Sequence, residues 1–173
     1  VVVSSGDPGV FAMASAVFEA VETGPLSWRE LDISVLPGIT AMLAAAARLG
    51  APLGHDFCVI NLSDNLKPWS IIETRLRLAV EADFAMAFYN PRSKARPEGF
   101  EKALDLLKSA CEKERLIMFA RAVSTPEESL LTVALSDATP DMADMRTMVL
   151  LGSRQTRLIP RKNAAPIVYT PRS

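Results

Sequence analysis

Two glycine turns decide the fold, VSSGDPGVF at residues 3–11 and LPGITA at residues 36–41. Each turn follows a short apolar run and opens a stretch in which apolar residues recur at helical spacing. The flanking runs are residues 1–3 and 11–22 for the first turn, and residues 33–36 and 40–49 for the second. Two successive strand–turn–helix units are typical of a parallel α/β sheet, which binds ligands beyond the carboxyl ends of its strands. The turns therefore mark a predicted binding edge.

The residues of the turns suit close approach of the backbone to a ligand. Gly6, Gly9 and Gly38 lack a Cβ atom and can take positive φ. The prolines beside them fix φ and stiffen the turns. Asp7 and Thr40 stand where the predicted helices begin, so each could instead be an N-cap. The spacing alone leaves both interpretations open.

Composition narrows the class of protein. The chain has 173 residues, 49% of them hydrophobic and 23% charged, which predicts a folded protein of one domain or two small ones. A net charge of −1 gives no field that would recruit nucleic acid or an anionic membrane. No apolar run reaches the roughly 18 residues of a membrane span. Cys58 and Cys111 are predicted to be reduced packing residues of a cytoplasmic protein, and with one histidine no metal site is expected.

The rest of the chain predicts a second, mixed lobe. Helices are expected over residues 68–81 and 98–113, and strands over residues 57–62, 83–90, 115–120, 129–135, 148–151 and 167–169. A Gly/Pro cluster at residues 50–54 predicts a boundary between an N-terminal lobe over 1–53 and a C-terminal lobe over 54–173. Because the chain opens inside a β-like run, we expect upstream sequence to be absent and the first lobe to be incomplete.

Four motifs occur in order along the chain: SGDPGVF at 5–11, LPGITA at 36–41, FYNP at 88–91 and MRTMVLLG at 145–152. Together they resemble the tetrapyrrole methylases, the S-adenosylmethionine enzymes of cobalamin and sirohaem synthesis. LGHDFCVINLSD at 53–64 and LGSRQTR at 151–157 are similar to the branch that methylates precorrin-3B at carbon 17. The sequence departs from the family at Ser5, where many relatives have a second glycine, and in lacking an initial Gly-Pro-Gly loop.

The resemblance implies a two-lobed α/β fold, with a parallel sheet in the first lobe and a mixed sheet in the second. It also implies a folded S-adenosylmethionine cofactor held largely by backbone groups. The cofactor-binding residues carried over by motif are Ser5, Gly6, Asp7, Val10, Thr40, Ala41, Asn90, Ala122, Arg146 and Thr147. A sulfonium methyl donor is already electrophilic, so such a site mainly aligns the reactants and excludes water.

Relatives in this branch methylate carbon 17 of a precorrin and contract its ring, a step that needs a proton donor or acceptor. His55 and Asp64 are the candidates; the alternatives are a linker histidine without chemistry and a turn or N-cap aspartate. The substrate carries many carboxylates, which Arg92, Lys94 and Arg96 would clamp unless their loop is only a solvated surface.

Two other functions stay open at this point. A tetrapyrrole methylase acting at a different ring carbon would carry the same motifs. A non-catalytic, truncated fragment would explain the abrupt start. The resemblance further implies a homodimer, with no nucleic-acid or membrane partner.

Overall fold

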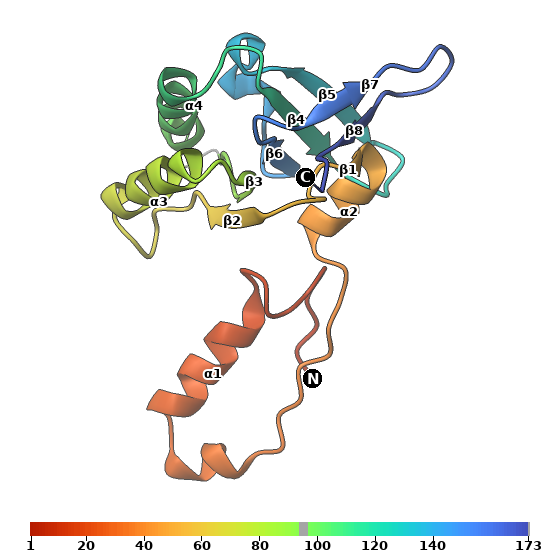
Figure 1. Ribbon diagram of the computed structural model, residues 1–173. Coiled ribbons are helices and arrows are strands. Elements are labelled where there is room, and N and C mark those ends of the chain that lie inside the picture. Colours follow the sequence, from red (N-terminus) through yellow and green to blue (C-terminus); the bar gives the residue numbers. More distant parts are fainter. Residues whose placement is uncertain (94–96, 173) are drawn as a thin grey trace. The chain divides into compact units, whose positions relative to one another are not determined.

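The computed structural model describes residues 1–93 and 97–172 (Figure 1). The chain divides into two units, Val1–Leu43 and Ala44–Ser173, which are described separately. The predicted lobe boundary after residue 53 lies inside the second unit.

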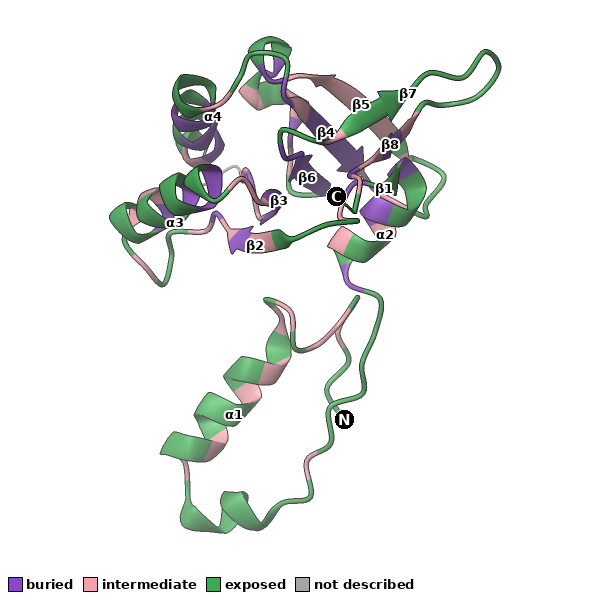
Figure 2. Cartoon of the chain, viewed as in Figure 1, coloured by how far each residue is buried: buried purple, intermediate pink, exposed green. Residues whose placement is uncertain are grey.

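The first unit contains helix α1 (Met13–Thr23) and a 3-10 helix, η1 (Leu26–Glu30). Helix α1 buries none of its residues, and Figure 2 shows it as exposed and intermediate throughout. No residue from 1 to 43 belongs to a hydrogen-bonded strand. The expected parallel sheet of the first lobe is therefore not confirmed, because neither residues 1–3 nor residues 33–36 have a neighbouring strand to bond.

Helix α2 (Ala41–Leu49) begins in the first unit and ends in the second, close to the predicted 40–49. In the second unit it is followed by a small sheet with the order β1–β8–β7. Its strands are β1 (Gly50–Ala51), β7 (Arg157–Ile159) and β8 (Ile167–Tyr169). Residues 50–51, which belong to the Gly/Pro cluster expected to mark a lobe boundary, thus form a strand. At Gly50 φ is 133°, and an added Cβ would lie 2.5 Å from the Val168 carbonyl oxygen.

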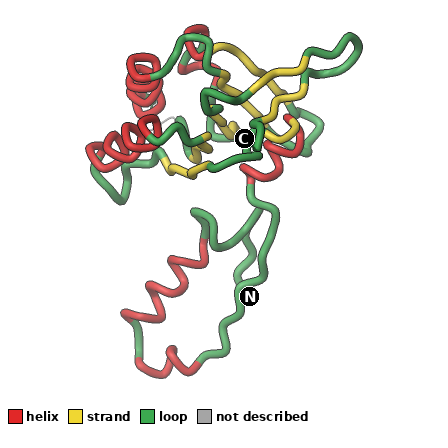
Figure 3. Tube along the Cα trace, viewed as in Figure 1, coloured by secondary structure: helices red, strands yellow, loops and turns green. Residues whose placement is uncertain are grey.

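The main sheet of the second unit has five strands in the order β2–β3–β6–β4–β5. Its strands are β2 (Phe57–Asn61), β3 (Ala85–Tyr89), β4 (Leu116–Arg121), β5 (Ser129–Ala134) and β6 (Thr147–Leu151). Strands β2 and β3 are parallel, whereas every other neighbouring pair is antiparallel. The mixed sheet predicted for the second lobe is confirmed, and Figure 3 shows its strands together in the second unit.

Helices α3 (Trp69–Glu81) and α4 (Glu98–Ala110) bury their apolar stripes against this sheet (Figure 1). Phe100 of α4 meets Phe119 of β4 edge to face, with ring centroids 6.1 Å apart. Alternate residues of the central strands, such as Met86 and Phe88, complete the core. Two single-turn 3-10 helices, η2 (Leu135–Asp137) and η3 (Pro140–Met142), lead into β6. Among the helices of residues 1–93 and 97–172, none combines the length and hydropathy of a membrane span.

Candidate functional site

In the first unit, the two glycine turns are tied together by the carboxylate of Asp7. Its Oδ1 accepts a hydrogen bond from the Gly9 amide at 2.8 Å, and its Oδ2 accepts one from the Gly38 amide at 3.1 Å. Gly6 has a φ of 74°, and a Cβ added to Gly38 would overlap the carbonyl oxygen of Gly6. The two turns therefore pack backbone against backbone. Asp7 does not cap α1, whose N-cap is Ala12.

The other predicted residues of the first unit surround this contact. Val10 donates its amide to the Asp7 carbonyl at 3.3 Å, and Ser5 is exposed beside Gly6. Thr40 is buried directly before α2, and its carbonyl accepts the Leu43 amide at 3.0 Å. Ala41 is the first residue of α2. The structure thus brings the two turn motifs together, and the binding of a ligand at them stays a prediction.

In the second unit, the remaining predicted cofactor residues lie at one end of the main sheet. The carboxyl ends of β2, β3 and β4 meet the amino end of β6 there, as the strand register requires. Ala122 follows β4 and donates its amide to the Arg146 carbonyl at 2.9 Å. Thr147, the first residue of β6, pairs with Arg121 of β4. Asn90 directly follows β3.

The backbone at this end of the sheet is held in a conformation that costs free energy. Asn90, Ala122 and Ser124 have φ values of 51°, 48° and 64°. Such values are uncommon outside glycine, and strained residues of this kind concentrate at functional sites. Asn90 is further fixed because its Nδ2 donates to Asn61 Oδ1 at 3.1 Å. Asn61 was not predicted from the sequence, although its place at the end of β2 could have indicated it.

Three carboxylates pair with arginines around the same loops. Glu128 accepts hydrogen bonds from Arg48 of α2, the shortest at 2.6 Å, and these contacts lower the pKa of its carboxyl. The Thr125 hydroxyl and then Arg146 lower the pKa of Glu127. Burial acts to raise the pKa of Asp144, but hydrogen bonds from Thr147, Arg121 and the Arg146 amide outweigh it and lower that pKa. All three are therefore anionic at neutral pH.

The two candidate proton-transfer residues lie at opposite ends of β2. His55 precedes the strand, and its Nδ1 accepts the Asp56 amide at 2.6 Å. Together with Asp83 and Ser153, it lines a cavity of about 260 Å³. Asp64 follows β2 at the end where Asn90 lies, near the Lys67 ammonium. Burial and then the charge of Arg75 lower the pKa of Lys67, and the Asp64 carboxylate offsets only part of this effect. The structure therefore does not bring His55 and Asp64 together.

Arg92, of the predicted carboxylate clamp, is half-buried after β3, and its Nη1 donates to the Pro140 carbonyl at 3.4 Å. Lys94 and Arg96 lie outside the described residues.

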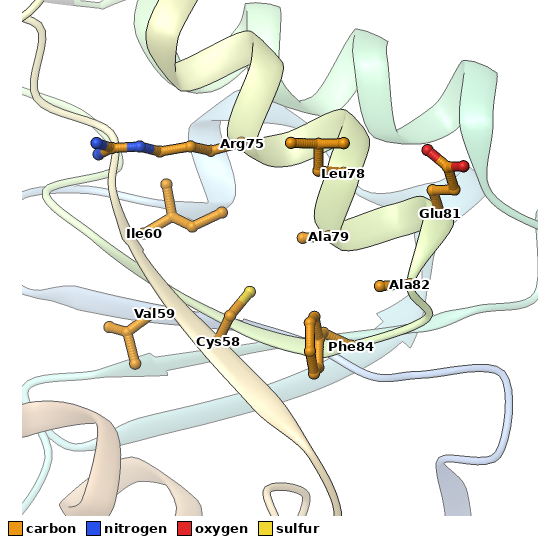
Figure 4. Close-up of a pocket in the computed structure, with 9 residues that line it drawn as sticks. All are labelled: Cys58, Val59, Ile60, Arg75, Leu78, Ala79, Glu81, Ala82 and Phe84. Atoms are coloured by element: carbon orange, nitrogen blue, oxygen red, sulfur yellow. The ribbon is translucent and has the colours of Figure 1, made fainter.

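A larger apolar cavity of about 760 Å³ lies between β2 and α3 (Figure 4). Figure 4 shows the Cys58 thiol turned toward α3, and burial raises the pKa of that thiol. Arg75 and Glu81 are the charged residues of its lining. None of the predicted site residues that the structure describes lines it, so this cavity is distinct from the described part of the candidate site.

Known proteins show the same sequence pattern over nearly the whole chain. The sequence model of the tetrapyrrole (corrin/porphyrin) methylase family matches residues 1–139. A precorrin-3B C(17)-methyltransferase of Sinorhizobium is 53% identical over 170 residues, which cover 98% of this chain and 67% of that protein. The cobalamin biosynthesis protein CobIJ of Mycobacterium tuberculosis is 43% identical over 175 residues, which cover 99% of this chain and 34% of that protein.

The structural comparison agrees with the sequence comparison. The crystal structure of the methyltransferase CobJ is 64% identical, with a TM-score of 0.91 over 99% of this chain and 69% of that one. Uroporphyrin-III C-methyl transferase from Thermus thermophilus, solved with S-adenosyl homocysteine, is 19% identical with a TM-score of 0.55, over 85% of this chain and 62% of that one. The Thermus protein shares the fold, whereas the closer relatives are methyltransferases and proteins of cobalamin biosynthesis. The chain belongs to the tetrapyrrole (corrin/porphyrin) methylase family.

Proposed function

We propose that this chain is the catalytic part of an S-adenosylmethionine-dependent methyltransferase that methylates carbon 17 of precorrin-3B and contracts its ring. The observation that carries the proposal is the 53% identity to the Sinorhizobium enzyme over 98% of the chain. Because the chain spans 67% of that protein and 34% of CobIJ, the activity is proposed for the whole protein that contains it.

The glycine turns support binding of the methyl donor. The contact between Gly6 and Gly38 leaves a backbone surface free of Cβ atoms, and the Asp7 carboxylate holds it in place. S-adenosylmethionine would supply an electrophilic methyl group, so the protein must orient the donor and exclude water. The residues proposed to bind it are Ser5, Gly6, Asp7, Val10, Thr40 and Ala41 in the first unit, and Asn90, Ala122, Arg146 and Thr147 in the second.

For Asp7, the proposed contribution is orientation of the turns. Both of its carboxylate oxygens already accept hydrogen bonds from backbone amides, one in each turn. The amides of Gly9 and Gly38 are thereby occupied, which leaves neighbouring backbone groups of the turns to contact a ligand.

Substrate contacts are proposed at the Asn90 end of the main sheet. Arg92 would bind a carboxylate of the macrocycle, aided by Lys94 and Arg96. Of the two proton-transfer candidates, the position of Asp64 beyond β2 favours it over His55, which lies at the other end of that strand. Loss of ring contraction with retained methylation in Asp64→Asn would support this assignment. Retention of both steps in Asp64→Asn would contradict it.

A cobalt-containing substrate is the second candidate. A probable cobalt-factor III C(17)-methyltransferase of Salmonella typhimurium is 38% identical over 97% of this chain. Cobalt would be part of the substrate in that case, so the same protein residues would serve both reactions.

The test is an assay of the whole protein with S-adenosylmethionine and either precorrin-3B or cobalt-factor III. NMR of the product identifies the methylated carbon and shows whether the ring has contracted. Methylation at carbon 17 supports the proposal, and methylation at another carbon replaces it with a different activity of the family. Thr40→Arg, which places a long cation at a buried position, is expected to abolish turnover.

We further propose a homodimer in the cytoplasm. The free thiols of Cys58 and Cys111 are consistent with a reducing compartment. Light scattering after size-exclusion chromatography tests the dimer, and a monomeric mass at assay concentration would contradict it.

A further inference from the structure

The turn that leads into β6 is closed by reciprocal hydrogen bonds between Asp144 and Thr147. The Asp144 amide donates to Thr147 Oγ1 at 3.1 Å, and in return the Thr147 amide donates to the Asp144 carbonyl at 3.2 Å and the Thr147 hydroxyl donates to Asp144 Oδ1 at 2.7 Å. Asp144 Oδ1 also accepts the Arg146 amide at 2.9 Å. One carboxylate oxygen thus fixes the backbone of residues 144–147, since side-chain bonds of this kind stabilise turns.

The second carboxylate oxygen joins the turn to β4. Asp144 Oδ2 accepts a hydrogen bond from Arg121 Nε at 2.8 Å. Arg121 is the last residue of β4 and lies opposite Thr147 in the strand ladder. The Asp144 carboxylate therefore connects the two strand ends that carry Ala122 and Arg146.

The backbone conformation of Ala122 depends on this connection between the two strand ends. Its φ of 48° is unfavourable for a residue with a Cβ atom, so surrounding contacts must hold it there. Its amide is bound by the Arg146 carbonyl at 2.9 Å, and its carbonyl is bound by the Thr125 amide and hydroxyl at 3.2 and 2.8 Å. If the turn at 144–147 loosens, the Arg146 carbonyl moves and Ala122 can relax to negative φ.

We propose that Asp144 is a positioning residue for the methyl-donor site. It holds the backbone of Ala122 and Arg146 in the ligand-binding conformation through the turn at 144–147, and it does not itself contact the donor. This inference rests on the proposed function, in which Ala122, Arg146 and Thr147 bind S-adenosylmethionine. The mechanism predicts that changes at Asp144 weaken donor binding while leaving the chemical step intact.

Two substitutions separate the bonds that Asp144 makes. Asp144→Ala removes all three side-chain contacts, and hydrogen bonds to a charged group are strong enough that about a tenfold loss of affinity is expected. Asp144→Asn keeps an oxygen for the Arg146 amide but loses the charge that faces Arg121, so a loss of about threefold is expected. Asp137→Ala is the matched control, because within the part of the chain that the structure describes the exposed Asp137 side chain accepts a hydrogen bond only from its neighbour, Ser136 Oγ.

The experiment measures S-adenosylhomocysteine binding to the whole protein by calorimetry, together with KM for S-adenosylmethionine and kcat at saturating donor. We expect KM to rise in the order Asp137→Ala, Asp144→Asn, Asp144→Ala, with kcat preserved. A purely structural role would lower the folded fraction, and with it kcat, without changing KM. Unchanged affinity in a folded Asp144→Ala protein would overturn the proposal.

Failure of the proposed function gives a different result. If the wild-type protein does not bind S-adenosylhomocysteine, the methyl-donor site itself is wrong. If the wild-type protein binds and Asp144→Ala does not fold, the isosteric Asp144→Asn protein decides the question, because wild-type KM in that variant overturns the positioning role.

Discussion

Two regions of the molecule have similar apolar sequences but very different surroundings. One is the pair of runs at residues 1–3 and 33–36 in the first unit, and the other is strand β3 in the second. Val2 is 63% exposed and Leu36 is 78% exposed, whereas Met86 and Phe88 of β3 are fully buried. β3 has a hydrogen-bonded neighbour on each side, and the two runs of the first unit have none. The contrast shows that an apolar β-like pattern specifies a strand only where other strands complete the ladder.

A cavity in the hydrophobic core of the second unit should produce the largest loss of stability. Phe100→Ala removes a fully buried ring that packs against Phe119, and a cost of about 3–5 kcal/mol in the free energy of unfolding is expected. Urea denaturation followed by circular dichroism measures it. Leu26→Ala in η1, where the side chain is 74% exposed, is the control and should change stability by less than about 0.5 kcal/mol. Equal losses at both positions would contradict the contrast between the units.

Gly38→Ala tests the first unit through ligand binding. For the wild-type protein, S-adenosylhomocysteine at one hundred times its dissociation constant should add about 2.7 kcal/mol to the free energy of unfolding. This corresponds to a rise in Tm of roughly 5–10 °C. The added Cβ overlaps the Gly6 carbonyl oxygen, so the shift should disappear. Gly99→Ala in α4 is the matched control, because among residues 1–93 and 97–172 its Cβ would meet only the Leu62 carbonyl oxygen, at 3.9 Å. A full ligand shift in Gly38→Ala would show that the contact between the turns is not needed for binding.

A smaller, pH-dependent effect is expected at the ion pairs of the second unit. The backbone amide of Glu112 and the guanidinium groups of Arg115 and Arg154 lower the pKa of the Glu112 carboxyl from 4.5 to about 2. Because the folded pKa is the lower one, this stabilisation is complete above about pH 4.5 and is lost as the pH falls toward 2.

Glu112→Gln should therefore flatten the dependence of Tm on pH between 4.5 and 2, with little other change, since the Glu112 side chain is 48% exposed. Thermal melts across that range measure the effect. An unchanged slope would assign the pH dependence to other carboxylates, of which Asp144 is one whose pKa is also lowered.

Much of the second unit could be predicted because apolar residues recur at helical or strand spacing within its longer elements. The pattern after Pro68 predicts a helix to Glu81, and α3 ends at that residue. The helix predicted over 98–113 ends earlier, at Ala110, because Cys111 adopts an extended conformation. Strands β1 and β7 were not predicted, since two or three residues are too few for a period to be recognised.

The candidate site was predictable where a turn motif specifies it and not where side chains from distant segments meet. Gly6, Gly38 and Asn90 stand in recognisable motifs, and the structure places them at turns or strand ends. The pairing of Arg121 with Asp144 depends on strand register, which no local pattern encodes. The Asp–x–x–Thr spacing of residues 144–147 was the available signal, as it is typical of a side-chain-closed turn.

The contact between Gly6 and Gly38 has an evolutionary consequence. The atom that excludes a side chain at position 38 is a carbonyl oxygen, which every amino acid carries, and not a side chain that could be exchanged. No substitution at position 6 can make room for it. Descendants of this sequence can therefore replace Gly38 only if the backbone conformation of both turns changes. No single second substitution can compensate for a side chain at position 38.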